Sequence, residues 1–467
     1  MRHLNFLFLL SVSSLAWLVS GCGGGNSIGH TTQITAFNNP GTQTVGAPLT
    51  LSATASSGLT VSWTSATPSV CTVSGSTATF GAAGTCTIDA SVAGNSTYAA
   101  ATQVAQSFTV NPAIGPTTTI YITGYAISTA SSASNVVTVA EEWRLTSGSP
   151  TATATALATP SGMTSAQANA IAVSGSDVYV AGWASNSTSR TAVYWLNGTA
   201  TTLPSSMTFA HANAIAVSGG NVYVAGYEEN TGGIGNAVLW VNGTATTLSP
   251  PSGMAYSDAA AIAISGSNVY VVGIAWNTNN DESAALWVNG TPTLLPMPSG
   301  LTGDYYAYGI AVSGGNVYVA GFTNPSAGTE TAISWVNNGA ATTLPIPPND
   351  SAGDYAAGGI TVSGSNVYVA GSGTNGATDV TNAAYWINGT ATSLPLPSYI
   401  QGSAGTTYAS GIAVSGGDVY AVGSLMDSPA GVGQTAVYWV NGGGATLLPM
   451  PSDTYESWAG AIAVATQ

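Results

Sequence analysis

The chain has 467 residues and a formal net charge of −15. Its length favours two or more domains or an array of repeats. Only 4% of the residues are charged, and Arg144 and Arg190 are the only cations after Arg2. A nucleic-acid partner is therefore not expected, because phosphate binding needs clustered Lys and Arg. Apolar and β-branched residues are plentiful, which argues against a disordered chain.

The first residues are typical of an export signal. Arg2 and His3 precede an apolar run, Leu4–Val19, which is too short to span a membrane comfortably and is followed by small residues. We therefore expect a signal peptide over residues 1–21 and a flexible tether over residues 22–30. No other run is long enough for a transmembrane helix.

The segment Val19-Ser20-Gly21-Cys22 resembles a bacterial lipobox. The resemblance implies cleavage before Cys22 and a diacylglycerol on its sulfur, and two or three acyl chains together anchor a protein stably. Gly23 rather than Asp follows the cysteine, which by resemblance to diderm lipoproteins leaves sorting to the outer membrane open. We expect an exported protein anchored in the bacterial envelope, at the outer membrane or cell surface. An ordinary secretory signal is the alternative.

Apart from the lipobox cysteine, Cys71 and Cys86 form an even pair in an exported protein, which predicts a disulfide. Short segments of alternating apolar and polar residues surround them and predict strands. The stretch Pro68–Tyr98 resembles a bacterial immunoglobulin-like repeat domain. The resemblance covers residues 31–112 and implies an immunoglobulin-like sandwich that acts as a spacer or adhesive stalk. Trp63 is expected in its core.

Residues 117–467 are a repeat array with three recurring strings, I-A-V-S-G, V-Y-V-A-G and W-x-N-G or a relative of it. The last string carries Trp143, Trp195, Trp240, Trp287, Trp335, Trp386 and Trp439. By subtraction of their numbers, these tryptophans are 45 to 53 residues apart. A period of about 50 residues made of four short strands is typical of a β-propeller blade. The array is similar to exported bacterial propeller-repeat proteins of uncharacterised function.

The strands predict stacked sheets and a closed ring. In Val178–Ala181 the valines point one way and the tyrosine and alanine the other, without charges, so neighbouring sheets must cover both faces. The array begins with a second strand, Ile120–Ile122, and ends with a lone first strand, Ile462–Val464. Pairing of these two strands would close a seven-bladed, all-β propeller and remove its sheet edges. An open β-solenoid is the alternative.

The two ends of each predicted blade differ. One end has uniform tight turns, such as Asn197-Gly198. The loops at the opposite end vary in length and sequence, as expected for a binding surface, and carry most acidic residues of the array. We expect this variable-loop face to favour cations, cationic ligands or polyols. The alternative is that its charges serve solubility alone.

Candidate binding residues gather at the variable-loop face. The residues four positions before each inner-strand Ile are expected to rim the central channel, and they are Gln167, His211, Asp258, Tyr306, Ala356, Tyr408 and Trp458. Four aromatic residues are expected near the same face after the second strand, namely Trp183, Tyr227, Trp276 and Phe322. Aromatic rings beside carboxylates and amides suit sugar stacking or peptide capture, although such rings also pack strand ends. The ligand-binding candidates are Trp183, His211, Tyr227, Asp258, Trp276, Asp304, Tyr306, Asp354, Tyr408 and Trp458.

Enzyme chemistry is less well supported by the sequence. His30 and His211 are the only histidines after the signal, which argues against a nucleophilic triad. No His/Cys metal cluster exists, and we expect no cofactor, although the oxygen-rich segment Asn277–Glu282 could hold structural calcium. Asp304 with Asp354 could perform glycoside chemistry, but the chain has little Arg, Lys or His to orient a substrate.

The leading hypothesis is a lipid-anchored envelope protein whose variable-loop face binds a glycan, peptide or protein. The first alternative is a structural or adhesive surface module without a discrete pocket. The second is a carbohydrate-active hydrolase or lyase. Membrane contact is expected through the lipid anchor alone, and the sequence does not specify an oligomeric state.

Overall fold

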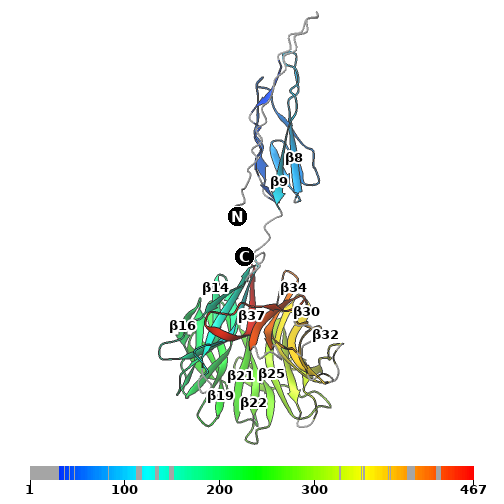
Figure 1. The fold of residues 1–467 in the computed structure, drawn as a ribbon. Helices are drawn as coiled ribbons and strands as arrows, with labels where there is room; N and C mark the ends of the chain where they lie inside the picture. Colours follow the sequence, from blue (N-terminus) through cyan, green and yellow to red (C-terminus); the bar gives the residue numbers. More distant parts are fainter. Residues whose placement is uncertain are drawn as a thin grey trace, which may run out of the picture. The chain divides into compact units, whose positions relative to one another are not determined.

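The computed structural model describes residues 31–35, 37–41, 43–46, 48–82, 84–111, 118–131, 136–146, 152–325, 328–348, 350, 353–376, 378, 380–396, 405–426 and 433–466. Contacts divide the chain into two compact units, Met1–Gly115 and Pro116–Gln467. Within the described ranges all regular elements are strands, β1 to β37 (Figure 1), which confirms the all-β class. None of these ranges holds a helix able to cross a membrane. The predicted signal peptide, the tether and Cys22 lie outside them.

The first unit is built from two main sheets and one small one. One main sheet has the order β2-β9-β8-β5, and the other has the order β3-β7-β6. β1 and β4 form a separate pair. The strands are β1 (Ile34–Thr35), β2 (Gln43–Thr44), β3 (Leu49–Thr50), β4 (Thr54–Ala55), β5 (Ser62–Ser65), β6 (Cys71–Ser74), β7 (Thr77–Phe80), β8 (Gly84–Ser91) and β9 (Val104–Asn111).

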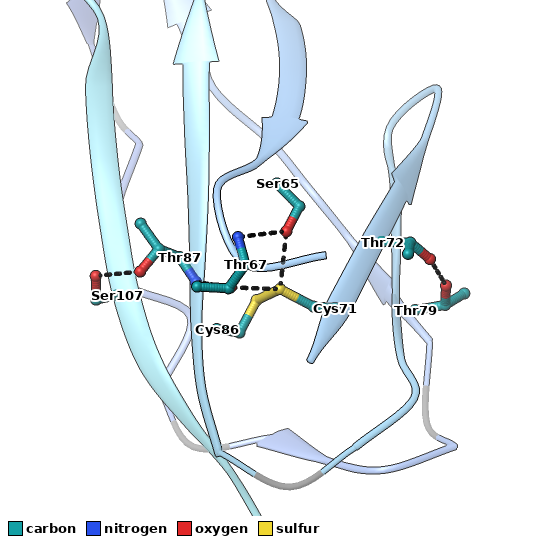
Figure 2. The surroundings of a disulfide bond; sticks show 8 residues. All are labelled: Ser65, Thr67, Cys71, Thr72, Thr79, Cys86, Thr87 and Ser107. Atoms are coloured by element: carbon teal, nitrogen blue, oxygen red, sulfur yellow. Dashed lines mark hydrogen bonds between the residues drawn. A yellow bond between two sulfur atoms is a disulfide. The ribbon is translucent and has the colours of Figure 1, made fainter. Parts of the chain in front are cut away.

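A disulfide between Cys71 and Cys86 joins the two main sheets and confirms the predicted pairing (Figure 2). Both cysteines are fully buried in the core of the unit, beside Phe80 and Phe108. In the chain-entropy account, a loop of this size adds about 3 kcal/mol of stability. Trp63 is half-buried against this core, with its ring edge-on to a neighbouring phenylalanine. A small domain buries little apolar surface, and the disulfide therefore adds stability to this core.

The second unit contains six four-stranded arrangements made from consecutive strands. A single bridging residue pair, Arg190 with Phe209, connects the first two arrangements. The strands are β13 (Ser165–Ser174), β14 (Asp177–Ser185), β15 (Arg190–Leu196), β16 (Thr199–Thr202); β17 (Phe209–Ser218), β18 (Asn221–Glu229), β19 (Gly235–Val241), β20 (Thr244–Thr247); β21 (Tyr256–Ser265), β22 (Asn268–Trp276), β23 (Glu282–Val288), β24 (Thr291–Leu294); β25 (Asp304–Ser313), β26 (Asn316–Asn324), β27 (Thr331–Val336), β28 (Thr342–Thr343); β29 (Asp354–Ser363), β30 (Asn366–Asn375), β31 (Val380–Ile387), β32 (Thr390–Ser393); β33 (Thr406–Ser415), β34 (Asp418–Met426), β35 (Gln434–Val440) and β36 (Thr446–Leu447).

A seventh four-stranded sheet combines both ends of the repeat array. Its order is β12-β11-β10-β37, and we call it the composite sheet. Its strands are β10 (Thr118–Ser128), β11 (Thr138–Thr146), β12 (Thr153–Ala156) and β37 (Thr454–Thr466). β37 runs antiparallel to β10, with Ile462 opposite Ile122 and Val464 opposite Ile120. The strand that completes this sheet thus comes from the far end of the sequence.

The first strands of the seven sheets lie next to one another in a ring. β13 contacts β17, β17 contacts β21, β21 contacts β25, and the series continues through β29 and β33 to β37, which contacts β13. The sheets fan outward from these strands in a propeller-like arrangement (Figure 1). Because each sheet is covered on both faces by its neighbours, both of its faces can be apolar.

The repeat tryptophans connect each sheet to the preceding one. All seven are 0–1% exposed. Each indole Nε1–H donates to a backbone carbonyl just after the fourth strand of the preceding sheet, at 2.7–2.9 Å. Trp143 of the composite sheet donates to Pro449, which closes the series. The other pairs are Trp195 with Ala158, Trp240 with Pro204, Trp287 with Ser249, Trp335 with Pro296, Trp386 with Pro345 and Trp439 with Pro395.

One end of the sheets is held by a repeated turn. Asn242 has a φ of 49° and Gly243 a φ of 81°, the left-handed pair that a type I′ turn requires. The Asn242 side chain also accepts a hydrogen bond from the Val222 backbone and donates one to Asn221. Five other sheets have an equivalent asparagine, at positions 197, 289, 337, 388 and 441. The two tight turns at this end of these six sheets are therefore bonded to each other.

Candidate functional site

A central cavity of about 410 Å³ lies inside the ring of first strands. All seven first strands contribute to its wall. The wall includes one unpaired residue from a β-bulge in each strand, namely Asn169, Asn213, Ala260, Tyr308, Gly358, Ser410 and Gly460. These residues lie two positions before the inner-strand Ile. The residues four positions before it, which we expected to rim the channel, do not line this cavity, and their place at the rim stays a prediction.

Glycine in the second strand allows the bulge to form. Gly226 lies opposite Ala212, and a Cβ at Gly226 would collide with the backbone carbonyl of His211. The same collision would occur at the equivalent glycines, which are Gly124, Gly182, Gly273, Gly321, Gly371 and Gly423. The glycine of the V-Y-V-A-G string is thus required by close backbone approach.

Trp183 of the sheet that begins with β13 lies beside His211 and Tyr227 of the sheet that begins with β17, and we call these three residues the histidine group. His211 pairs with Tyr227 across two strands, and their rings stack with centroids 4.4 Å apart. Arg190 lies over the Trp183 ring at 4.3 Å and bonds to Nε2 of His211 at 2.8 Å. Burial, followed by the Arg190 charge, lowers the pKa of His211 to about 3. The imidazole is therefore neutral at physiological pH and is a very weak base.

Tyr306, Tyr308 and Phe322 form a second cluster, the tyrosine group, in the sheet that begins with β25. The Tyr308 and Phe322 rings stack with centroids 5.7 Å apart, and the Tyr306 ring lies 4.9 Å from Phe322. Burial, followed by the effect of the Glu282 carboxylate on the preceding sheet, raises the pKa of the Tyr306 phenol.

Tyr408, Trp458 and Tyr125 form a third cluster, the tryptophan group, across the ring-closing boundary. Trp458 stacks on Tyr408 at 6.0 Å and on Tyr125 at 6.2 Å. Tyr125 and Trp458 lie opposite each other in the composite sheet. Burial, followed by the charge of Glu456, raises the pKa of Tyr125. Three chain segments that are distant in the sequence therefore form one continuous aromatic surface.

The remaining aromatic candidate, Trp276, does not join these three clusters. It lies opposite Tyr256 at the ends of β21 and β22, with ring centroids 5.8 Å apart. Among the other residues expected at the rim, Gln167 lies opposite Trp183, and Ala356 lies opposite Ser372. The candidates thus sort into distinct groups on the first and second strands of the sheets.

Asp304 and Asp354 each form a hydrogen bond to the preceding sheet. The Asp304 carboxylate accepts a hydrogen bond from the backbone of Glu282 at 2.9 Å. The Asp354 carboxylate accepts one from the backbone of Glu330 at 2.7 Å. Each aspartate is the first residue of its strand and caps the third-strand segment of the preceding sheet. Both therefore have a role in assembly.

Asp258 has a different environment. Burial, then the charges of Glu229 and Glu282, raise its pKa to about 7. One of its carboxylate oxygens is buried and has no hydrogen-bond partner among the residues that the structure describes. Asp258 therefore has a buried acceptor atom without a partner among the described residues.

The oxygen-rich loop that could hold calcium is engaged in its own hydrogen bonds. The Asn277 side chain donates to the Asp281 carboxylate and accepts from the backbones of Asn279 and Asp281. In the described ranges, no group of three His, Cys, Asp or Glu residues is arranged to hold a metal ion. The calcium hypothesis gains no support from these contacts.

Sequence reasoning missed three residues of these clusters, namely Arg190, Tyr308 and Tyr125. Arg190 is one of two cations after Arg2 and lies five positions before the repeat tryptophan Trp195, so it was a usable signal. Tyr308 occupies the bulge position, which the glycine of the facing strand could have revealed. Tyr125 becomes relevant only after the two ends of the array pair, so no local pattern marks it.

No protein-family model matches the chain, and no curated protein matches its sequence. Solved structures that are similar include YjhT, at 13% identity over 62% of this chain and 99% of that one, with a TM-score of 0.35. A quinonprotein alcohol dehydrogenase-like protein from Bacteroides thetaiotaomicron has 11% identity, covers 91% of this chain and 97% of its own, and has a TM-score of 0.37. An alpha-L-arabinofuranosidase from Clostridium thermocellum has 13% identity, with coverage of 50% and 94% and a TM-score of 0.27. Similarity this weak assigns no activity to the chain.

Proposed function

We propose that the chain is an exported lipoprotein with an immunoglobulin-like module followed by a seven-bladed β-propeller. The four-stranded sheets and their ring of first-strand contacts support the propeller. The buried disulfide supports export, since such bonds persist in oxidising compartments. The lipobox resemblance supports an anchor at Cys22.

The proposed function is binding of a glycan, peptide or protein at the variable-loop face of the propeller. One observation carries this proposal. Each of the three groups includes a first-strand ring, namely His211, Tyr306, Tyr408 or Trp458, that lies two positions before a cavity-lining residue. Aromatic faces with carboxylates nearby offer both stacking and hydrogen bonding to a ligand. The neutral, weakly basic His211 and the structural bonds of Asp304 and Asp354 favour binding over hydrolysis.

Binding can be tested with glycan and peptide arrays probed by the purified protein. Trp458→Ala and Tyr408→Ala should each reduce binding by about tenfold, because each removes a stacking face. Val336→Ala, which changes an exposed apolar side chain beside the tight turns, is the matched control and should bind as the parent does. Unchanged binding in both aromatic variants would refute the site. Turnover of a bound glycan that Asp304→Asn abolishes would show a hydrolase instead.

The anchor can be tested separately by fractionating cells that express the full chain. Cys22→Ser should move the protein from the membrane fraction to the soluble fraction and abolish labelling by a palmitate analogue. Cys71→Ser is the matched control, because it breaks the disulfide with Cys86 but leaves Cys22 in place, so this variant should keep the lipid. Continued membrane labelling of Cys22→Ser would contradict the lipidation proposal.

A further inference from the structure

A second cavity, of about 350 Å³, lies between the sheet that begins with β25 and the sheet that begins with β29, and we call it the intersheet cavity. Both sheets contribute to its walls, the first with Tyr318 and Ser334 and the second with Ile360, Val367 and Val369. It also borders the Asn-Gly turn of the second sheet, and no residue of the histidine, tyrosine or tryptophan group lines it. The intersheet cavity is therefore separate from the candidate site described above.

A serine at one repeat position accounts for this space. Ser334 directly precedes a repeat tryptophan, and it pairs with Thr342 of the fourth strand, as Tyr385 pairs with Thr392 in the next sheet. In the other six sheets the same position holds a larger side chain, namely Glu142, Tyr194, Leu239, Leu286, Tyr385 or Tyr438. Because protein interiors are close-packed, the short serine leaves open a volume that a tyrosine or leucine would fill.

The next boundary along the ring shows how a tyrosine fills the corresponding space. Tyr385 belongs to one core cluster with three residues of the following sheet, Ile412, Val419 and Ala421. These are the counterparts in the repeat of the three wall residues that the second sheet gives to the intersheet cavity. The Tyr385 hydroxyl reaches the turn of the following sheet, since a Cβ at Gly442 would lie 3.2 Å from its oxygen. The walls of the intersheet cavity are thus placed to hold a phenol ring.

The intersheet cavity has buried walls and an accessible side. Trp335 and Val369 in its walls are 1% and 3% exposed, whereas Val336, which also lines it, is 47% exposed. Gly389, the counterpart of Gly442, also lines it, and a Cβ at Gly389 would meet no atom within 4 Å. The fourth strand of the first sheet, β28, has two residues, whereas β16, β20, β24 and β32 have four. A small molecule therefore has a route from solvent into the space.

The ligand class follows from the chemistry of the lining. Among the described residues that line the cavity, none is Asp, Glu, Lys, Arg or His, so a charged ligand would lose hydration without gaining a partner. The Asn388 amide is already bonded to the Val367 backbone and to Asn366. A sugar would bury several hydroxyl groups against mainly apolar walls. Apolar cavities take up small aromatic molecules, and a single ring with one polar group matches the tyrosines of the other repeats.

We propose that the intersheet cavity binds a small uncharged aromatic compound of the phenol type, in the place that a repeat tyrosine occupies in other sheets. The ligand is a free small molecule, because the space lies between two packed sheets and admits a single ring rather than the surface of a partner protein. This site is distinct from the variable-loop face, so the inference goes beyond the proposed function.

Isothermal titration calorimetry of the full chain at neutral pH tests this proposal. The probe is p-cresol, which has the structure of a detached tyrosine side chain and is uncharged because a phenol has a pKa of about 10. The charged counterpart with the same ring is p-toluenesulfonate, and glucose is the polyol. We expect p-cresol to bind at about one molecule per chain and to raise the melting temperature, and we expect the other two compounds not to bind.

Variants locate the binding. Ser334→Tyr and Ser334→Leu restore side chains found in other repeats, and each should weaken p-cresol binding by more than about tenfold because it fills the space. Ser334→Ala, which keeps the space, is the matched control and should change binding by less than about twofold. Tyr194→Ser makes the reverse change between the sheets that begin with β13 and β17, and it should raise the stoichiometry to about two. Thermal melting verifies folding, and Ser334→Leu keeps the test valid if Ser334→Tyr unfolds.

Three outcomes would overturn the inference, namely no binding of p-cresol, equal binding of p-toluenesulfonate or glucose, or full binding of p-cresol by a folded Ser334→Tyr or Ser334→Leu variant. Trp458→Ala separates this site from the variable-loop face and should bind p-cresol as the parent does. Loss of p-cresol binding in Trp458→Ala, with binding kept in Ser334→Tyr, would place the ring at the tryptophan group. The present inference would then fall, and the proposed function would stand.

Discussion

The composite sheet and the six sheets built from consecutive strands reach the same architecture by different routes. In the composite sheet β37 pairs with β10 from the other end of the array, and Trp143 makes the same indole bond to the preceding sheet as the other six tryptophans. One core position differs. Glu141 is fully buried, whereas the equivalent positions hold Val193, Val238, Ala285, Ile333, Ala384 and Val437. The composite sheet therefore makes the same contacts as the other six sheets, although it buries the carboxyl group of Glu141.

Among the changes considered, removal of residues 454–467 should have the largest effect, because it removes β37 from the composite sheet. The composite sheet would lose β37, and β10 would become an exposed edge next to uncovered sheet faces. We expect loss of the cooperative melting transition of the second unit, or association of chains through the open edge, in calorimetry and gel filtration. Deletion of residues 31–111, which removes the first unit, is the control and should preserve that transition. A truncated chain that melts as the parent does would show that closure contributes little.

Trp143→Ala and Trp287→Ala compare the closing tryptophan with an internal one. Both rings are fully buried, so each substitution should cost about 3–5 kcal/mol in urea unfolding. Equal losses would mean that the closing boundary is packed as tightly as the others. A much smaller loss for Trp143→Ala would show that the ring is loose where the two ends meet.

Glu141→Val tests the unfavourable group at the boundary. Both carboxylate oxygens lack hydrogen-bond partners in the described ranges, so valine should stabilise the protein by about 1–3 kcal/mol in urea unfolding. Val238→Glu, the reverse change at an equivalent position, is the matched control and should destabilise. Lower stability of Glu141→Val would reveal a favourable contact of the carboxyl.

Burial of Glu141 predicts that the stability of the protein depends on pH. Burial raises the pKa of Glu141 from 4.5 to about 8, so the folded state keeps a proton that the unfolded state has lost. Stability should therefore fall as the pH rises from about 4.5 to about 8, and this contribution should be constant above that range. Asp258, whose pKa is about 7, contributes in the same direction. Urea unfolding across this range should show a smaller decline in Glu141→Gln, and an identical decline would contradict the assignment.

Asn242→Gly should have the smallest effect, about 1 kcal/mol. Glycine tolerates the left-handed backbone conformation, so the loss reflects the side-chain hydrogen bonds to Val222 and Asn221 alone. Asn242→Ala should cost more, since alanine also strains the turn. Thermal melting measures both, and equal costs would show that the backbone conformation contributes nothing.

The sequence predicted the features that repeat locally. The tryptophan spacing, the Asn-Gly turns and the complementary end strands each follow from short-range patterns, and the structure contains the corresponding bonds, turns and β10–β37 pairing. The bulge of each first strand, whose unpaired residue lines the cavity, was not predicted. Register depends on backbone hydrogen bonding between strands, which alternation alone does not specify.

The candidate site was predicted only in part, for a related reason. His211 with Tyr227 and Tyr306 with Phe322 are identifiable from the sequence because they flank the ends of repeated strings, and they do contact each other. The contact of Trp458 with Tyr125 needs the ring to close first. Contacts between sheets are long-range in sequence, so side-chain type alone could not reveal them.

The bulge in each first strand has a consequence for how the protein can change. It places one residue per sheet at the wall of a shared interior space. Substitution at Ala260 or Ser410 would alter the chemistry of that space while leaving the tryptophan bonds and the turns intact. The scaffold therefore offers a small set of independently replaceable positions, through which new selectivity can arise without rebuilding the fold.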